Sequence, residues 1–239
     1  MDAKKHYEHH LAEFYEWMVG DFDARQQEQQ AYFEDNAIFP KSNHIAIDLG
    51  AGHGLQSVSL AKLGFEVKAI DFNILLLNSL QKRKGNLHID LIESDLIDFR
   101  DKVKESELIV CMGDTISHLD SFEQFEIVLN SCYKNLSEGG IFITSYRDYS
   151  IELTDTNRFI PVRSDENRIL TCILDFEDDK VLVTDLLHEK SGDGWKQKLS
   201  SYYKLRLNQG LVKDFLLQNG FQIIKTENRN RMFYTIAKK

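Results

Sequence analysis

The order of apolar and polar positions along this chain predicts short strands and amphipathic helices that follow one another in turn. Compact apolar runs predict strands at residues 44–49, 66–70, 87–92, 107–112 and 140–146. Apolar residues at helical spacing predict helices at residues 54–63, 73–83 and 121–136. This alternation is typical of an α/β fold with a doubly wound, mostly parallel sheet. In such a sheet the ligand site lies beyond the carboxyl ends of the strands.

The first forty residues predict a separate helical cap. Leu11, Phe14 and Met18 recur at helical spacing, so we expect helices from residue 6 to about residue 36. Gly20-Asp21 can end one of these helices and begin the next. We therefore divide the chain into a cap of residues 1–40 and a main domain of residues 41–239.

An insertion and a final hairpin complete the expected main domain. After a polar loop at 148–165, three runs predict antiparallel strands at 168–176, 180–189 and 195–207. We expect residues 150–207 to form a β insertion that serves either as a lid or as an interface between copies. A helix at 209–219 and strands at 221–227 and 231–237 would follow, and the two strands bring the sheet to seven.

The strand at 44–49 runs into a glycine-rich turn, Asp48-Leu49-Gly50-Ala51-Gly52-His53-Gly54, that opens the next helix. Glycines let the backbone turn sharply and approach a ligand closely. The spacing G-x-G-x-G differs from the G-x-G-x-x-G of dinucleotide-binding proteins, which opposes a dinucleotide-dependent oxidoreductase. Asp48 disfavours a pyrophosphate and favours a cationic ligand such as S-adenosylmethionine. Asp71, at the end of the next strand, can accept hydrogen bonds from both ribose hydroxyls.

Composition narrows the range of partners. The net charge of −9 and the pI near 5.4 disfavour nucleic acid and anionic membrane surfaces. No apolar signal core and no membrane-length apolar run is present, so we expect a cytoplasmic protein. The isolated cysteines favour a reducing compartment and no zinc site: Cys111, Cys132 and Cys172. We interpret His6, His9 and His10 as a solvated helix face rather than metal ligands, because no acid or cysteine stands at ligand spacing.

The glycine turn, with Asp71 and Asp95, resembles that of the class I S-adenosylmethionine-dependent methyltransferases, and most of all their glycine/sarcosine N-methyltransferase-like group. Four further stretches occur in the same order as in that group: Tyr15-x-x-Met18-Val19-Gly20-Asp21-x-x-x-Arg25, Cys111 to Leu119, Tyr146 to Tyr149, and Ser201-Tyr202-Tyr203. The resemblance implies a Rossmann-like methyltransferase fold. It also implies S-adenosylmethionine as methyl donor and S-adenosylhomocysteine as product.

The resemblance also implies how the cofactor is held. Tyr15 and Arg25 would close over it, and the Arg25 guanidinium would grip the methionyl carboxylate, although Arg25 can also be a solvated helix charge. Asp95 would accept from the adenine amine, while Met112 is either part of the cofactor's floor or core. The implied cofactor-binding residues are Tyr15, Arg25, Asp48, Gly50, Gly52, Asp71, Phe72, Asp95, Leu96, Met112, Gly113 and Thr115.

Four residues are implied on the acceptor side: Asp114, His118, Arg147 and Tyr149. Arg147 corresponds to an arginine that holds the carboxylate of a small amino-acid acceptor, although it and Tyr149 can also belong to a surface loop. Asp114 stands where the group has asparagine, and it would favour a cationic acceptor or orient an amine. We expect methyl transfer to a small molecule, an amine in the first instance. An oxygen acceptor would need His118 or Asp114 as base, and a non-catalytic cofactor-binding module is the alternative of another class.

Overall fold

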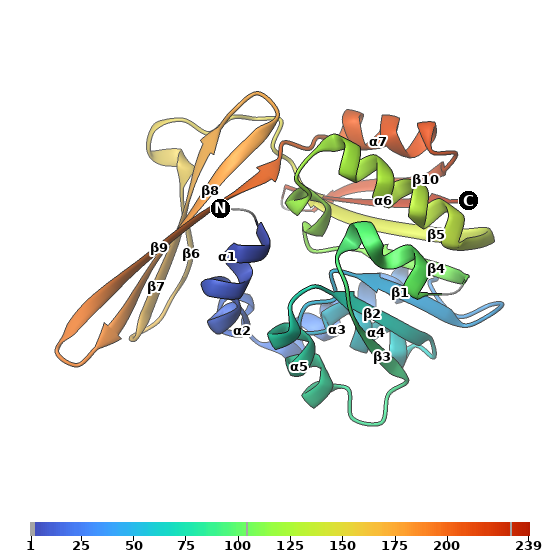
Figure 1. The fold of residues 1–239 in the computed structure, drawn as a ribbon, viewed down its shortest axis with the longest axis horizontal. Coiled ribbons are helices and arrows are strands. Elements are labelled where there is room, and N and C mark those ends of the chain that lie inside the picture. Colours follow the sequence, from blue (N-terminus) through green and yellow to red (C-terminus); the bar gives the residue numbers. More distant parts are fainter. Residues whose placement is uncertain (1–2, 104, 230) are drawn as a thin grey trace.

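A seven-stranded sheet forms the centre of the larger part of the molecule (Figure 1). The structure, a computed structural model, describes residues 3–103, 105–229 and 231–239. The sheet has the order β10-β11-β5-β4-β1-β2-β3; β1 to β5 are parallel, and β11 is antiparallel to β5 and β10. These strands are β1 (Ile45–Leu49), β2 (Glu66–Asp71), β3 (Ile89–Glu93), β4 (Ser106–Cys111), β5 (Leu136–Arg147), β10 (Gln222–Arg229) and β11 (Met232–Lys238). The prediction of a mostly parallel seven-stranded sheet is confirmed.

The helices of this part begin where the sequence supplies a capping side chain. Asn73 accepts hydrogen bonds from two N–H groups in the first turn of α5, and Ser121 and Asn208 each accept one at the start of α6 and α7. The helices are α4 (Leu55–Lys62), α5 (Ile74–Arg83), α6 (Phe122–Asn135) and α7 (Gln209–Gln218), and short 3-10 segments are η2 (Leu96–Lys102) and η3 (Thr115–His118). All four helices lie within two residues of their predicted bounds.

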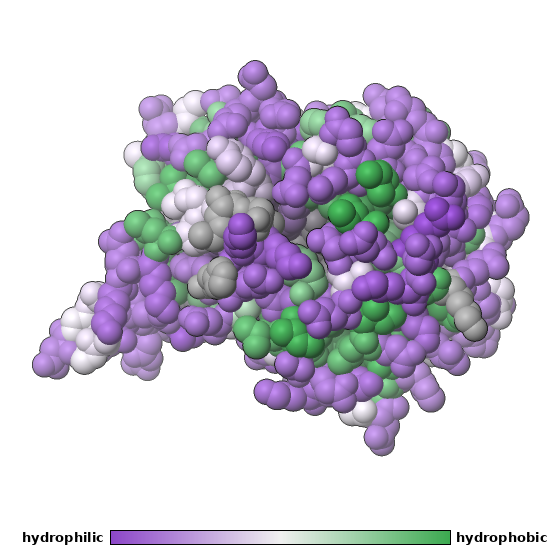
Figure 2. All heavy atoms as spheres, viewed as in Figure 1, coloured by the Kyte–Doolittle hydropathy of each residue, from purple (hydrophilic) through white to green (hydrophobic). Residues whose placement is uncertain are grey.

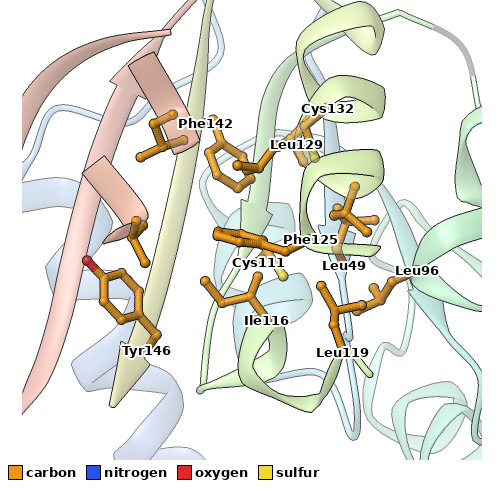
Figure 3. Packing of buried hydrophobic residues seen from close by; sticks show 14 of the residues in the cluster. Leu49, Leu96, Cys111, Ile116, Leu119, Phe125, Leu129, Cys132, Phe142 and Tyr146 are labelled. Atoms are coloured by element: carbon orange, nitrogen blue, oxygen red, sulfur yellow. The ribbon is translucent and has the colours of Figure 1, made fainter. Parts of the chain in front are cut away.

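Two clusters of buried apolar residues lie on opposite faces of the sheet. Neighbouring residues of a strand point to opposite sides, so Ala46 joins the cluster under α3 and α4 while Ile47 joins the one under α6 and α7. Figure 3 shows the second cluster, in which Phe125 of α6 lies near the fully buried Cys111, and the fully buried Cys132 lies near Leu129. The parallel strands are thus covered on both faces, as such sheets require.

The N-terminal residues form a row of short helices, as predicted: α1 (Ala3–His9), η1 (Leu11–Glu13), α2 (Tyr15–Val19) and α3 (Phe22–Asp35). Asp21 caps α3 by accepting from Ala24 N, at 3.0 Å. The interpretation of the histidines as a solvated face is wrong for His6, which is fully buried, and for His10, which is 7% exposed. His6 is buried because it contacts Asp185, a residue distant in the sequence. The side chain of His9 lies outside the described residues.

A second, antiparallel sheet stands beside the first and projects away from it (Figure 1). Its order is β6-β7-β8-β9, with β6 (Phe159–Ser164), β7 (Arg168–Phe176), β8 (Lys180–Ser191) and β9 (Gly194–Leu205), and the 3-10 segment η4 (Asp155–Arg158) precedes it. Three of these strands match the predicted insertion. The fourth, β6, lies in a stretch expected to be a loop. The sequence pattern missed this strand because it is an exposed edge strand that contains Pro161.

The surface of the molecule is mostly hydrophilic, and its hydrophobic residues gather in separate patches (Figure 2). One patch covers the start of α5, where Ile74 is 48% and Leu75 is 51% exposed. Within the described residues, no helix is both long enough and apolar enough to cross a membrane.

Candidate functional site

A cavity of about 300 Å³ opens beyond the carboxyl ends of β1 to β4. This is the position where the strand order reverses, since β2 and β4 lie on either side of β1. The N-terminal segment contributes Lys4, Tyr7 and Tyr15 to its wall. The cavity therefore lies between the sheet and the helical cap, as the sequence predicted for the ligand site.

The glycine turn forms one wall, and its backbone leaves no room for a side chain at the first glycine. Gly50 has φ of +72°, and a Cβ atom there would lie 2.3 Å from Cγ2 of Thr115. Thr115 in turn donates to the Met112 carbonyl at 2.7 Å. Only glycine fits this position, so the turn after β1 and the turn after β4 meet directly at the cavity.

Asp71 is held rigidly at the end of β2. Its Oδ2 accepts from Gly52 N and its Oδ1 accepts from Asn73 N, each at 2.8 Å. Burial raises the pKa of Asp71 to about 6, against the effect of these two hydrogen bonds. Each carboxylate oxygen retains a second lone pair, so the group can accept two further hydrogen bonds from a ligand.

Asp48, in contrast, lies behind the cavity wall. It is 1% exposed and accepts from Ser57 Oγ of α4 at 2.6 Å, and it does not line the cavity. Burial raises the pKa of Asp48 to about 7, although Ser57 donates to it. The structure therefore separates Asp48 from the other acids that the sequence grouped around the cofactor.

The remaining residues predicted for the cofactor line the cavity, except for one. The cavity wall includes Gly50, Gly52, Phe72, Asp95, Leu96, Met112, Gly113 and Thr115. Met112 is 3% exposed, so it belongs both to the core and to the wall. Arg25 lies elsewhere: its side chain is 58% exposed and pairs with Glu28 at 3.3 Å. Lys4 is the cationic side chain that lines the cavity within the described ranges.

Two tyrosines cover the cavity, and the sequence indicated only one of them. Burial, with Asp71 nearby, raises the pKa of Tyr15 to about 12, so its hydroxyl stays protonated. Tyr7 packs edge-on against Phe72 and His118, with ring centres 5.7 and 5.5 Å apart. The signal that could have found Tyr7 is its helical spacing to Leu11, which extends the apolar stripe by one turn.

On the acceptor side, Asp114 belongs to a buried polar cluster. Its carboxylate accepts from Lys204 Nζ at 2.5 Å, from Arg147 N at 2.8 Å and from the Tyr149 hydroxyl at 3.3 Å. Burial alone would raise the pKa of Asp114, but the Lys204 ammonium and the other donors hold it below its ordinary value. Burial would lower the pKa of Lys204, and Asp114 raises it instead. The pair is ionised.

This cluster corrects two expectations. Asp114 does not offer a free charge to a cationic acceptor, because Lys204 already neutralises it. The Arg147 side chain is exposed and lies outside the cavity wall, and only its backbone N–H reaches Asp114. Tyr149 also lies outside that wall. Lys204 was not singled out in the sequence, although its period-two spacing from Ser200 and Tyr202 predicts the inner face of its strand.

His118 is the acceptor-side candidate that lines the cavity. Its ring stacks on Tyr202, with ring centres 5.4 Å apart. Burial, and next the Lys204 ammonium, lower the pKa of His118 to about 3, so the ring is neutral. Its Nδ1 is buried and has no hydrogen-bond partner in the described part of the chain. Residues 3–103, 105–229 and 231–239 contain no cluster of side chains that could hold a metal ion.

Comparisons with known proteins agree with this geometry. Residues 46–140 match the family model described as "Methyltransferase domain". The glycine/sarcosine N-methyltransferase of Aphanothece halophytica is 26% identical over 113 residues, which are 46% of this chain and 42% of that protein. The chain thus matches less than half the length of this curated relative.

Two solved structures share the fold over nearly the whole chain. The CcbJ methyltransferase from Streptomyces caelestis has a TM-score of 0.78 at 14% identity and 95% coverage of both chains. An amino pentose methyltransferase of calicheamicin biosynthesis from Micromonospora echinaspora, with S-adenosylmethionine bound, has a TM-score of 0.70 at 12% identity and 92% coverage of both chains. The solved structures confirm the Rossmann-like fold, and the match of residues 46–140 to a methyltransferase domain supports the predicted class.

Proposed function

We propose that this chain, which has the domain and fold of a class I S-adenosylmethionine-dependent methyltransferase, methylates a small-molecule amine. The observation that carries the proposal is the cavity beyond β1 to β4, which joins a glycine turn, a rigid carboxylate and two covering tyrosines. When bound there, S-adenosylmethionine would supply an activated methyl group on a sulfonium that leaves readily.

The residues of the cavity fit this cofactor. Asp71 has free lone pairs for the ribose hydroxyls, and Asp95 and Leu96 follow β3, where the resemblance assigns the adenine. Among the residues that the structure describes, three acids and one lysine line the wall: Asp71, Asp95, Asp120 and Lys4. Such a wall suits a ligand with positive charge and is unfavourable for a pyrophosphate.

The chain's own contribution to methyl transfer would be alignment and the exclusion of water. Tyr7 and Tyr15 cover the cavity from the N-terminal side, so the reacting groups would meet in a dry space. Met112 and Gly113 would form the floor from the end of β4. No covalent intermediate on the protein is needed for an in-line displacement.

The low pKa of His118 favours an amine over a hydroxyl acceptor. A general base works best when its pKa lies near the operating pH. The pKa of His118 lies far below that pH. Asp114 is held ionised by Lys204 and lies outside the wall, so it is not a base for the acceptor either. A neutral amine needs no base during the displacement, and His118 would orient it by accepting a hydrogen bond at Nδ1, which is buried without a partner in the described part of the chain. The relatives named for glycine, sarcosine and an amino pentose support the same acceptor class.

Calorimetry with S-adenosylhomocysteine and S-adenosylmethionine tests the cofactor. We expect both to bind the wild type. We expect Asp71→Asn to weaken binding about 10-fold or more, since a hydrogen bond to a charged group contributes about 1.5–3 kcal/mol. Asp193→Asn, in the exposed turn between β8 and β9, is the matched control and should bind like the wild type. Failure of both ligands to bind, or binding of a nicotinamide dinucleotide, would overturn the proposal.

Turnover tests the reaction itself. Release of S-adenosylhomocysteine is followed with pools of small amines and, separately, of small alcohols and phenols. We expect product with the amine pool. Product only with the hydroxyl pool would refute the assignment of an amine, and cofactor binding without any turnover would favour a non-catalytic module.

A further inference from the structure

Helix α1 presents two faces to two different parts of the protein. Lys4 and Tyr7, three residues apart, line the cavity on one face. His6 lies on the other face, and its ring centre is 5.4 Å from that of His10, which directly follows the helix. Helix α1 lies beside the four-stranded sheet (Figure 1), and its other face lines the cavity, so it lies between the two.

The face toward the four-stranded sheet is fixed by one buried histidine. His6 Nδ1 and Ser200 Oγ share a hydrogen bond of 2.8 Å, and His6 Nε2 lies 3.1 Å from Asp185 Oδ2. The His6 and Asp185 side chains are 0% and 3% exposed. We call His6, Asp185 and Ser200 the clasp.

The surroundings of the clasp keep its carboxylate available. Burial alone would raise the pKa of Asp185, but the His6 ring 3.1 Å away and a hydrogen bond from the Cys172 thiol hold it below its ordinary value. Cys172 Sγ lies 2.7 Å from the second oxygen, Oδ1. Both oxygens of Asp185 are therefore engaged, one by the helix and one by β7.

A chain of aromatic ring contacts joins the clasp to the cavity. Tyr202 lies between His6, at 4.1 Å from ring centre to ring centre, and His118, at 5.4 Å. His118 in turn meets Tyr7 edge-on at 5.5 Å, and Tyr7 meets Phe72 at 5.7 Å. A displacement of His6 would therefore be transmitted to residues on the cavity wall.

Polar contacts that the described residues of η1 and α2 make with the small sheet are exposed at the surface. Glu13 of η1, for example, meets Lys198 at 3.4 Å, with side chains 65% and 45% exposed. Exposed ion pairs of this kind contribute little, because water screens them. The buried clasp is thus the polar attachment best able to fix the position of α1.

We propose that His6 is a positioning residue, and that its clasp to Asp185 and Ser200 holds α1 closed so that Tyr7 completes the wall over the bound cofactor. This inference rests on the proposed function, since it assigns how the same cavity is closed. The clasp also makes the four-stranded sheet part of the cofactor site, although no residue of that sheet lies on the described cavity wall.

Three variants test the clasp. His6→Ala removes both contacts, and His6→Gln retains an amide that can reach Asp185. His188→Gln is the matched control, because His188 follows the buried Leu187 on β8 and points to the opposite face of the sheet. The readouts are the dissociation constant for S-adenosylhomocysteine by calorimetry and the deuterium uptake of backbone amides, peptide by peptide.

We expect His6→Ala to weaken S-adenosylhomocysteine binding about 10-fold, because the apparent affinity falls with the fraction of molecules in which α1 is in its closed position. Deuterium uptake should rise in residues 3–9 and stay unchanged in β1 and β4. His6→Gln should recover most of the affinity, and His188→Gln should match the wild type. A folded His6→Ala protein that binds within about twofold of the wild type would overturn the clasp.

Two further results keep the outcomes distinct. If the wild type itself does not bind S-adenosylhomocysteine, the proposed function fails, whereas binding by the wild type and equally by His6→Ala refutes only the clasp. If His6→Ala does not fold, Ser200→Ala replaces it, because it deletes one hydroxyl. We then expect weaker binding and faster exchange in residues 3–9, and wild-type values for both would overturn the inference.

Discussion

Removal of the buried ammonium of Lys204 is expected to destabilise the protein strongly. Lys204→Met deletes the charge and keeps most of the volume, and it leaves the Asp114 carboxylate in a site where that side chain is 4% exposed. Breaking a buried pair by removing one partner costs about 3–5 kcal/mol. The hydrogen bonds from Arg147 N and the Tyr149 hydroxyl remain, so we expect the lower half of this range.

Thermal and urea unfolding at neutral pH measure this cost. In a protein of this size, 1 kcal/mol shifts Tm by about 2–4 °C, so the expected fall is about 6–16 °C. Lys198→Met is the matched control: this lysine is on the same strand, its side chain is 45% exposed, and its ion pairs with Glu13 and Glu189 are near the surface. The control should lose about 0–1 kcal/mol.

The double variant Lys204→Met with Asp114→Asn distinguishes the charge from the packing. If the cost comes from an unpaired carboxylate, neutralising it should restore part of the lost stability, since uncharged replacements of buried pairs are often near neutral. A loss below about 1 kcal/mol for Lys204→Met alone would refute the argument. A double variant no more stable than the single one would assign the loss to packing instead.

Three further expectations concern the cavity. Gly50→Ala should cost about 1–3 kcal/mol and weaken S-adenosylhomocysteine binding, because of its positive φ and the contact with Thr115; wild-type unfolding and calorimetry would contradict this. Asp48→Asn should stabilise the apoprotein by about 2–4 kcal/mol above pH 7 and by little near pH 4. The pKa of Asp48 is about 7 in the folded protein and 3.8 ordinarily, so the wild type loses stability as the pH rises between these values and the carboxyl ionises. A pH-independent difference in urea unfolding would count against this. Arg25→Ala should bind S-adenosylhomocysteine within about twofold of the wild type, because its exposed guanidinium pairs with Glu28; a 10-fold loss by calorimetry would show that it turns inward on binding.

The sequence predicted those parts of the site that depend on local patterns. The glycine turn, Asp71 and Asp95 each stand at or just after the end of a strand, and the carboxyl ends of parallel strands meet at one edge of the sheet. Periodicity alone therefore indicated that Asp71 and Asp95 would lie near the glycines. The same local reasoning predicted the antiparallel strands of the second sheet from their alternation and their turns.

The polar pairs could not be predicted in this way, because their partners are distant in the chain. Lys204 and Asp114 are 90 positions apart, and His6 and Ser200 are 194 positions apart. No local pattern indicates which buried acid will meet which base. For Arg25 the resemblance and the structure differ: the role implied for its guanidinium stays a prediction, while the structure presents the side chain to solvent beside Glu28.

The three free thiols give the protein its own reporters of local opening. Cys111 and Cys132 are sealed in the core beneath α6, where burial raises the pKa of each, and Cys172 lies in the other sheet against Asp185. A thiol-specific reagent can reach the first two only when the large sheet separates from α6. Cys172 is partly exposed, so its modification does not require such opening and serves as the reference rate in the same alkylation experiment.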